Sequence, residues 1–168
     1  MPYDVRIIAN HVLNEAEARG LKVTNLSLNK ILFFINGIYS AKIKMPLINE
    51  DAEAWEYGPV YREIYNQFKE LGSGEIKRRA RKLDFHTGRL IDIKEDLPDA
   101  DAGVINSWIS TLLNIPTWQL VEISHSPEGP WFQVWNYKSK SNPGMVIPYN
   151  LIENCFSTGY WLKERGLA

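Results

Sequence analysis

The chain has 168 residues, of which 45% are hydrophobic and 23% charged, and its nineteen basic and twenty acidic side chains give a formal net charge of −1. This length suffices for one domain with its own hydrophobic core, and the near-neutral charge excludes a global attraction to nucleic acid, anionic lipid or acidic substrates. Cys155 is the only cysteine, which excludes an internal disulfide and a thiolate-rich zinc site.

The first part of the chain is predicted to be helical. Residues 5–16 carry apolar side chains at helical spacing, so an amphipathic helix is expected there. A second helix is predicted over residues 28–39, where two adjacent phenylalanines widen the apolar stripe until little of the helix could face water, so it should be central. A third helix is predicted from Pro59, a residue suited to a first helical position, to Leu71.

The second part combines a β element with further helices. The basic run KRRARK at 77–82 precedes a Gly88 turn signal and an apolar stretch, which predicts a short hairpin around residues 85–94. Further helices are predicted at 104–113, at 117–124 and from Pro148 to about Gly166. The expected fold class is therefore mainly α, an α+β arrangement with a minor β element, in one compact multi-helix domain spanning residues 1–168.

The segment AWEYGP, residues 54–59, predicts a sharply defined turn. Gly58 supplies backbone freedom and Pro59 restricts the residue before it, so the pair is expected to set the start of the third helix. Trp55 and Tyr57 alternate along the segment, and in an extended chain they point to opposite sides, with Trp55 in the core and Tyr57 outward.

Three tyrosines give this region a second interpretation, compatible with the first, as a surface that grips a partner. Tyr57, Tyr61 and Tyr65 offer large rigid contact areas with polar ends. Tyr61 and Tyr65 lie one helical turn apart and are expected at the edge of the buried stripe, with their rings packed and their hydroxyls in water. Phe68 is expected in the core.

Two stretches together carry a resemblance to a known family: SLNKILFFINGIYSAKIKMPLINEDAEAWEYGPVYREIYNQFK at 27–69 and LVEISHSPEGPWFQVW at 120–135. A leucine-rich helix with an internal Lys, then PL, an acidic residue, AW, YGPV and a Tyr-containing helix, followed much later by a His segment ending in PW, resembles the Panacea domain of phage-associated proteins. The resemblance spans nearly the whole chain. It implies an antitoxin of a two-gene toxin–antitoxin pair that inhibits its toxin by direct protein contact, with no catalytic residue and no cofactor.

The partner implied by the resemblance is a cognate toxin protein encoded by an adjacent gene. Large aromatic and Arg side chains are the usual anchors of such interfaces. The candidate partner-binding residues are Tyr57, Tyr61, Tyr65, Arg78, Arg79, His125, Trp131 and Phe132. The chain could also form a homo-oligomer, a question on which the sequence does not decide. The protein is expected to be cytoplasmic with no membrane contact, since there is no N-terminal signal pattern and no apolar run of roughly 20 residues.

His125 suggests an alternative function, a hydrolase or nuclease that uses His125 with Glu128. Adjacent Ser and His residues do not make a triad, because nucleophile, base and orienting group must meet in space. The favoured interpretation is that His125 and Glu128 hydrogen-bond backbone in a tight turn while Trp131 packs. The three histidines of the chain show no spacing typical of a metal site, so no metal is expected.

The KRRARK run suggests a further alternative, a DNA-binding regulator of its own operon. Its five basic residues could neutralise phosphates. Acidic residues such as Asp92 and Glu95 follow closely, so a solvated face or a patch for an acidic partner is favoured over nucleic acid. Cys155 lies on the apolar stripe of the last predicted helix and is expected to act as a small buried hydrophobe.

Overall fold

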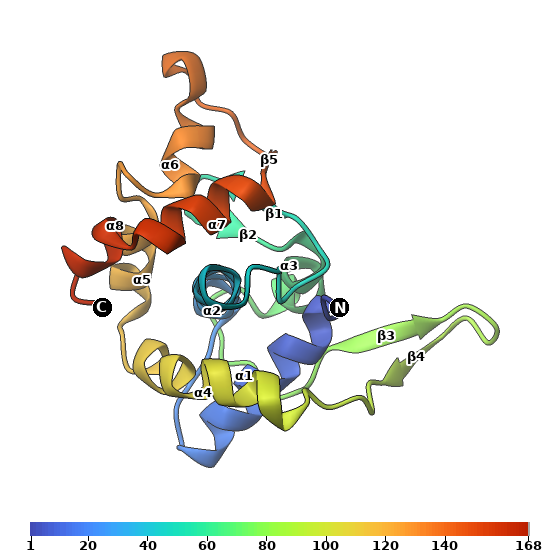
Figure 1. Cartoon of the computed structure of the whole chain (residues 1–168). Coiled ribbons are helices and arrows are strands. Elements are labelled where there is room, and N and C mark those ends of the chain that lie inside the picture. Colours follow the sequence, from blue (N-terminus) through green and yellow to red (C-terminus); the bar gives the residue numbers. More distant parts are fainter. Residues whose placement is uncertain (168) are drawn as a thin grey trace.

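The computed structural model describes residues 1–167, and one long helix lies at its centre. Helix α2 (Asn25–Ile43) is seen almost end-on in the middle of Figure 1. Most of its residues are buried, including both adjacent phenylalanines. Thr24 and Ser27 form a reciprocal capping box at its start, and the helix ends at Lys44 in the left-handed conformation. The prediction of a central helix is confirmed.

Shorter helices surround α2 on all sides in Figure 1. These are α1 (Val5–Ala18), α3 (Arg62–Phe68), α4 (Asp99–Leu113), α5 (Thr117–Ser124), α6 (Pro130–Trp135), α7 (Tyr149–Thr158) and α8 (Tyr160–Lys163), with the 3-10 turns η1 (Lys69–Leu71) and η2 (Tyr137–Ser139). Their apolar faces and α2 form one hydrophobic core, which confirms a mainly helical α+β fold. Within residues 1–167, no helix has both the length and the apolar character to cross a membrane.

Two separate β elements accompany the helices. Strands β1 (Ala52–Trp55), β2 (Gly58–Val60) and β5 (Met145–Ile147) form an antiparallel sheet in the order β2-β1-β5. In contrast, β3 (Arg81–Asp84) and β4 (Arg89–Asp92) pair only with each other. This second hairpin projects from the body of the molecule (Figure 1).

The structure corrects the expected role of Pro59. It lies in β2 opposite Ala54, and helix α3 begins only at Arg62. Because β2 is an edge strand, it can hold a proline that has no N–H to donate. The YGPV segment therefore closes a hairpin before the helix starts, so the prediction of a helix from Pro59 is wrong.

Other boundaries also differ from the predictions. The hairpin exists, but its strands are 81–84 and 89–92, because the basic run supplies the first strand, whose residues show no apolar alternation. The predicted last helix is broken at Gly159, which adopts a φ of 63° and separates α7 from α8. Helix 117–124 has the predicted bounds.

Candidate partner-binding surface

A buried lysine lies beneath the β1–β2 hairpin. Lys30, on α2, is 0% exposed, and its Nζ donates a hydrogen bond of 2.8 Å to the carbonyl oxygen of Pro59. Burial lowers the pKa of Lys30 to about 7, because desolvation penalises the charged form. The neighbouring Asn29 accepts a hydrogen bond of 2.8 Å from the backbone N–H of Tyr61. Two adjacent polar side chains of α2 therefore hold the strand and the residue that precedes α3.

Gly58 allows the hairpin to approach α2 and α5 this closely. It adopts a φ of 102°, a conformation that residues with a Cβ rarely adopt. A Cβ at this position would lie 2.5 Å from Oγ of Ser124 and 2.7 Å from Cε of Lys30. Position 58 therefore requires glycine for two reasons: its backbone conformation disfavours other residues, and there is no space for a Cβ.

The outer side of the hairpin carries packed aromatic side chains. The ring centroids of Trp55 and Tyr65 are 4.7 Å apart, and the guanidinium of Arg62 lies 5.5 Å from the Trp55 ring. Glu53 accepts hydrogen bonds from Trp55 Nε1 at 2.8 Å and from Arg62, which orients both side chains. Trp55 is half-buried at the surface, so its predicted core position is wrong. Tyr57 is 62% exposed, which confirms its outward position.

Helices α5 and α6 add a second aromatic stack. The His125 ring lies parallel to Trp131 with centroids 3.9 Å apart, and Trp131 stacks on Trp135 at 5.4 Å. Trp131 Nε1 donates a hydrogen bond of 2.9 Å to the carbonyl oxygen of Trp55, so the two stacks are joined. We use the term aromatic face for Trp55, Tyr57, Tyr65, His125, Trp131 and Trp135.

His125 has an environment that differs from the predicted turn. Its Nε2 is buried with no hydrogen-bond partner within residues 1–167, and burial together with the nearby charge of Lys30 lowers the pKa of its imidazole. The hydroxyl of Ser124 donates to a backbone carbonyl at 2.7 Å, and that of Ser126 donates to Glu128 at 3.4 Å. The prediction was that His125 and Glu128 hydrogen-bond to the backbone of the turn. Instead, the His125 ring stacks on Trp131 and the Glu128 carboxylate accepts from the Ser126 hydroxyl.

Some candidate anchors are not accessible at the surface. Tyr61 is 0% exposed, so the prediction that its hydroxyl reaches water is wrong. The reason is that β2 and the Asn29 contact draw the chain inward before α3 begins. Trp131 is only 4% exposed, and Phe132 is half-buried against the core, so both support the surface more than they form it. Phe68 is fully buried, as predicted.

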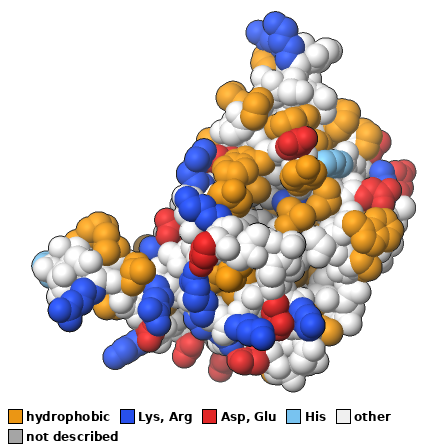
Figure 2. Space-filling view, turned by 180° about the vertical axis from the view of Figure 1, so that it is seen from behind, with side chains coloured by type: hydrophobic (Ala, Val, Ile, Leu, Met, Phe, Trp, Pro, Cys, Tyr) orange, Lys and Arg blue, Asp and Glu red, His pale blue; other side chains and the backbone are white. Residues whose placement is uncertain are grey.

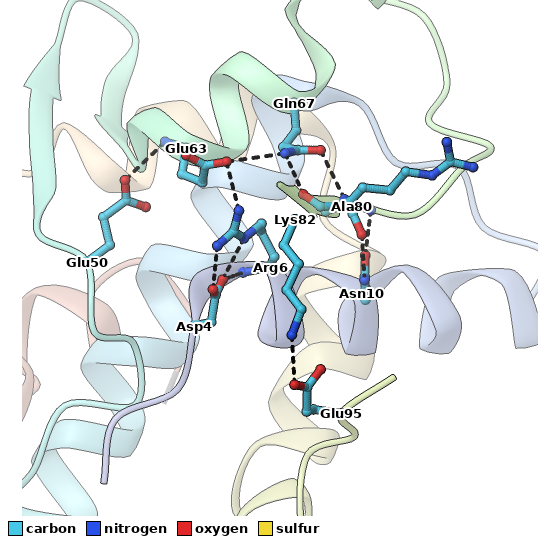
Figure 3. Close-up of polar contacts among 10 residues, drawn as sticks. Asp4, Arg6, Asn10, Glu50, Glu63, Gln67, Ala80, Lys82 and Glu95 are labelled. Carbon is cyan, nitrogen blue, oxygen red and sulfur yellow. Dashed lines mark hydrogen bonds and ion pairs between the residues drawn. The ribbon is translucent and has the colours of Figure 1, made fainter. Parts of the chain in front are cut away.

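Arg78 and Arg79 lie at the base of the β3–β4 hairpin and do not join the aromatic stacks. Arg78 pairs with Glu70, and Arg79 pairs with Glu17 at 2.5 Å. The base is held further by side-chain amides, as Figure 3 shows. Asn10 exchanges two hydrogen bonds with the backbone of Ala80, at 2.7 and 3.1 Å.

Several residues of the site could be found only in the structure. Lys30 was visible in sequence as a lysine inside an apolar helix, but its hydrogen bond to Pro59 depends on a strand 29 residues away in the chain. No motif or spacing in the sequence pointed to Trp135 or Arg62 as residues of the site. Cys155 is buried, as predicted. Among residues 1–167, no three His, Cys, Asp or Glu side chains are grouped to hold a metal ion.

The fold and the site define an α+β helical protein with a stacked aromatic surface supported by a buried lysine. Its sequence matches the family described as "Antitoxin SocA-like, Panacea domain" over residues 28–132, a segment that includes both hairpins and the His125–Trp131 stack. It is also 34% identical to Antitoxin SocA of Caulobacter vibrioides (strain NA1000 / CB15N) over 136 residues, which cover 79% of this chain and 71% of that protein. No solved structure matches it. The chain belongs to the SocA-like antitoxin family with a Panacea domain, so the resemblance is confirmed.

Proposed function

We propose that this chain neutralises a cognate protein toxin by binding it directly through the aromatic face. The observation that carries the proposal is the way the face is built: Trp55 is held by hydrogen bonds from two sides, while the nearby Tyr57 remains 62% exposed. Aromatic anchors on a rigid frame give a large contact area at little cost in conformational entropy. Tyr65 and His125, both half-buried, extend this surface on either side of the hairpin.

The proposed mechanism is occlusion of the toxin, with no chemical step by the antitoxin. An interface of about 800 Å² per partner is typical of stable protein complexes and could cover a toxin's active surface. We expect the toxin to be the product of an adjacent gene and the complex to form in the cytoplasm, with residues 1–168 acting as one domain. Membership of an antitoxin family supports this reading.

The two alternative functions have less support. A general base needs a nucleophile within hydrogen-bond reach, whereas the His125 ring stacks on Trp131 and the hydroxyls of Ser124 and Ser126 donate elsewhere. A DNA contact through KRRARK would compete with carboxylates, because four of its basic side chains are already in ion pairs. Both observations favour protein binding.

Co-expression tests the proposal. The adjacent gene is expressed alone, with this chain, and with its His125→Gln variant, and growth and co-purification are measured. We expect toxicity from the gene alone and rescue with a co-purifying complex from the wild-type chain. His125→Gln should largely keep this rescue, because His125 is one half-buried member at the edge of the aromatic face and Gln is polar and of similar reach. A hydrolytic activity that purified, folded wild-type protein has and the His125→Gln variant lacks would contradict the binding-only proposal.

A further inference from the structure

The β3–β4 hairpin and the basic run before it form a projecting arm, which we define as residues 77–94. The arm has seven basic and two acidic side chains. Three of the basic ones, Arg78, Arg79 and Lys82, pair with carboxylates outside the arm, which leaves a net charge of +2 in a chain whose formal charge is −1. Lys and Arg side chains are concentrated on this side of the molecule in Figure 2. Leu83, Phe85 and Leu90 are 44%, 90% and 61% exposed. A two-stranded hairpin with so few contacts to the rest of the protein is only marginally stable by itself. Exposed apolar side chains grouped in this way often mark a protein-binding surface.

The outer edge of β3 can accept another strand. The carboxamide of Gln67 accepts a hydrogen bond of 3.1 Å from the N–H of Arg81 and donates one of 2.8 Å to its carbonyl oxygen, as a neighbouring peptide group would. Residues two apart in a strand direct their backbone groups to the same side. Leu83 therefore presents its N–H and C=O to the same edge, where no other group within residues 1–167 binds them.

The two faces of the arm differ in chemistry. On one face Leu83 pairs with Leu90 across the hairpin, beside the Arg81–Asp92 ion pair. The opposite face carries Lys82 and Arg89 together with Asp84 and Ile91, because side chains alternate along each strand. A groove of about 350 Å³ beside the β3 edge is lined by Asn66, Gln67, Glu70, Arg78, Arg81 and Leu90. A complementary strand would carry apolar side chains on one face and acidic side chains on the other.

Two other occupants fit the arm less well. Pairing of two arms from two copies would place two positively charged hairpins, each with Arg89 exposed, against each other. Nucleic acid needs several phosphate contacts, but four basic side chains of the arm are already engaged by carboxylates. It would also meet the exposed leucines and a phenylalanine, whereas strand addition relies on backbone hydrogen bonds.

We propose that the arm is a second docking surface, which takes an extended acidic protein segment as an added strand on the free edge of β3. Backbone hydrogen bonds begin at Leu83, apolar side chains of the segment cover Leu83 and Leu90, and its carboxylates face Arg89. This surface does not depend on the aromatic face. Variants of Tyr65 should leave it intact, so the two proposals can fail separately.

Fluorescence anisotropy with the full chain tests the proposal. The probe is a labelled, end-blocked peptide of alternating Glu and Val. The comparison probes are a Lys–Val peptide, the Glu–Val peptide N-methylated at alternate residues, and a short DNA duplex. We expect the Glu–Val peptide to bind at least about tenfold more tightly than either comparison peptide and more tightly than DNA, since strand addition needs free peptide N–H groups and charge complementarity.

Two variants locate the binding. Leu83→Pro removes the outward N–H at an edge position that tolerates proline, and Arg89→Glu reverses an exposed charge. Each should weaken peptide binding by about tenfold while circular dichroism stays unchanged, whereas Lys140→Glu, an exposed site outside the arm, should have no effect. Equal binding of the N-methylated peptide, unchanged binding by both variants, tighter binding of DNA, or self-association abolished by Leu90→Glu would each overturn the proposal.

Discussion

The two hairpins of this molecule share a local structure but differ in their surroundings. In β1–β2, every residue of β2 is buried and alternate residues of β1 are buried. In β3–β4, every residue of β4 is exposed. The first hairpin is held from below by Lys30 and from the side by Trp131. The second is held at its base, by Asn10, Gln67 and ion pairs such as Lys82–Glu95.

This difference shows how one local motif can serve two kinds of surface. Backbone pairing gives each hairpin its shape, but only tertiary contacts make a hairpin rigid. The β1–β2 hairpin therefore presents Tyr57 from a fixed frame, suited to a preformed interface. The arm beyond its base has few contacts, which suits binding by addition of a strand.

The largest expected contrast concerns one phenylalanine near each hairpin. Phe68→Ala should lower the free energy of unfolding by about 3–5 kcal/mol, because the side chain is fully buried. Phe85→Ala, in the arm, should change it by less than about 0.5 kcal/mol, because that side chain is 90% exposed. Urea unfolding of both variants measures this. Similar losses would mean that the arm folds against the body.

The next contrast uses a glycine from each hairpin. Gly58→Val should cost about 3 kcal/mol or more, because the side chain would collide with Ser124 and Lys30 as well as strain the backbone. Gly88→Val, at a φ of 65° with open space around it, should cost only about 1–2 kcal/mol of backbone strain. Thermal melts compare the two. An unchanged midpoint for Gly58→Val would refute the close packing described for this hairpin.

A smaller effect is expected from pH. The pKa of Lys30 is lowered from 10.5 to about 7 in the folded chain, so between these values the unfolded chain binds more protons and stability rises with pH. The wild type should gain about 2 kcal/mol between about pH 7 and pH 9 from this group. Lys30→Met should abolish that gain, and exposed Lys140→Met should keep it. Denaturant unfolding at both pH values measures this gain. If the free energy of unfolding of Lys30→Met still rises with pH, another group causes the effect.

Much of the fold could be predicted because it depends on local periodicity. The amphipathic pattern of α1 and the nearly uniform apolar character of α2 reflect burial directly. The arm was predicted from Gly88 and the apolar residues after it. Its first strand was missed because exposed Arg81 and Lys82 need not alternate with apolar residues when neither face is buried.

The site was less predictable because its geometry depends on contacts between distant segments. Pro59 after Gly58 is compatible with a helix start or an edge strand, and pairing with β1 decides between them. Tyr61 and Tyr65 look equivalent at helical spacing. They differ because Tyr61 precedes the helix and is drawn inward by Asn29, while Tyr65 packs on Trp55 at the surface.

The central claim, that the aromatic face binds the toxin, is tested most directly by the dissociation constant of the toxin complex for Tyr65→Ala. We predict a loss of at least about 2 kcal/mol in binding, roughly thirtyfold, with a smaller effect on the melting temperature. Phe68→Ala should show the reverse, and Tyr149→Ala, a half-buried helical tyrosine outside the aromatic face, should bind normally. A folded Tyr65→Ala variant that binds the toxin at full strength would contradict the account.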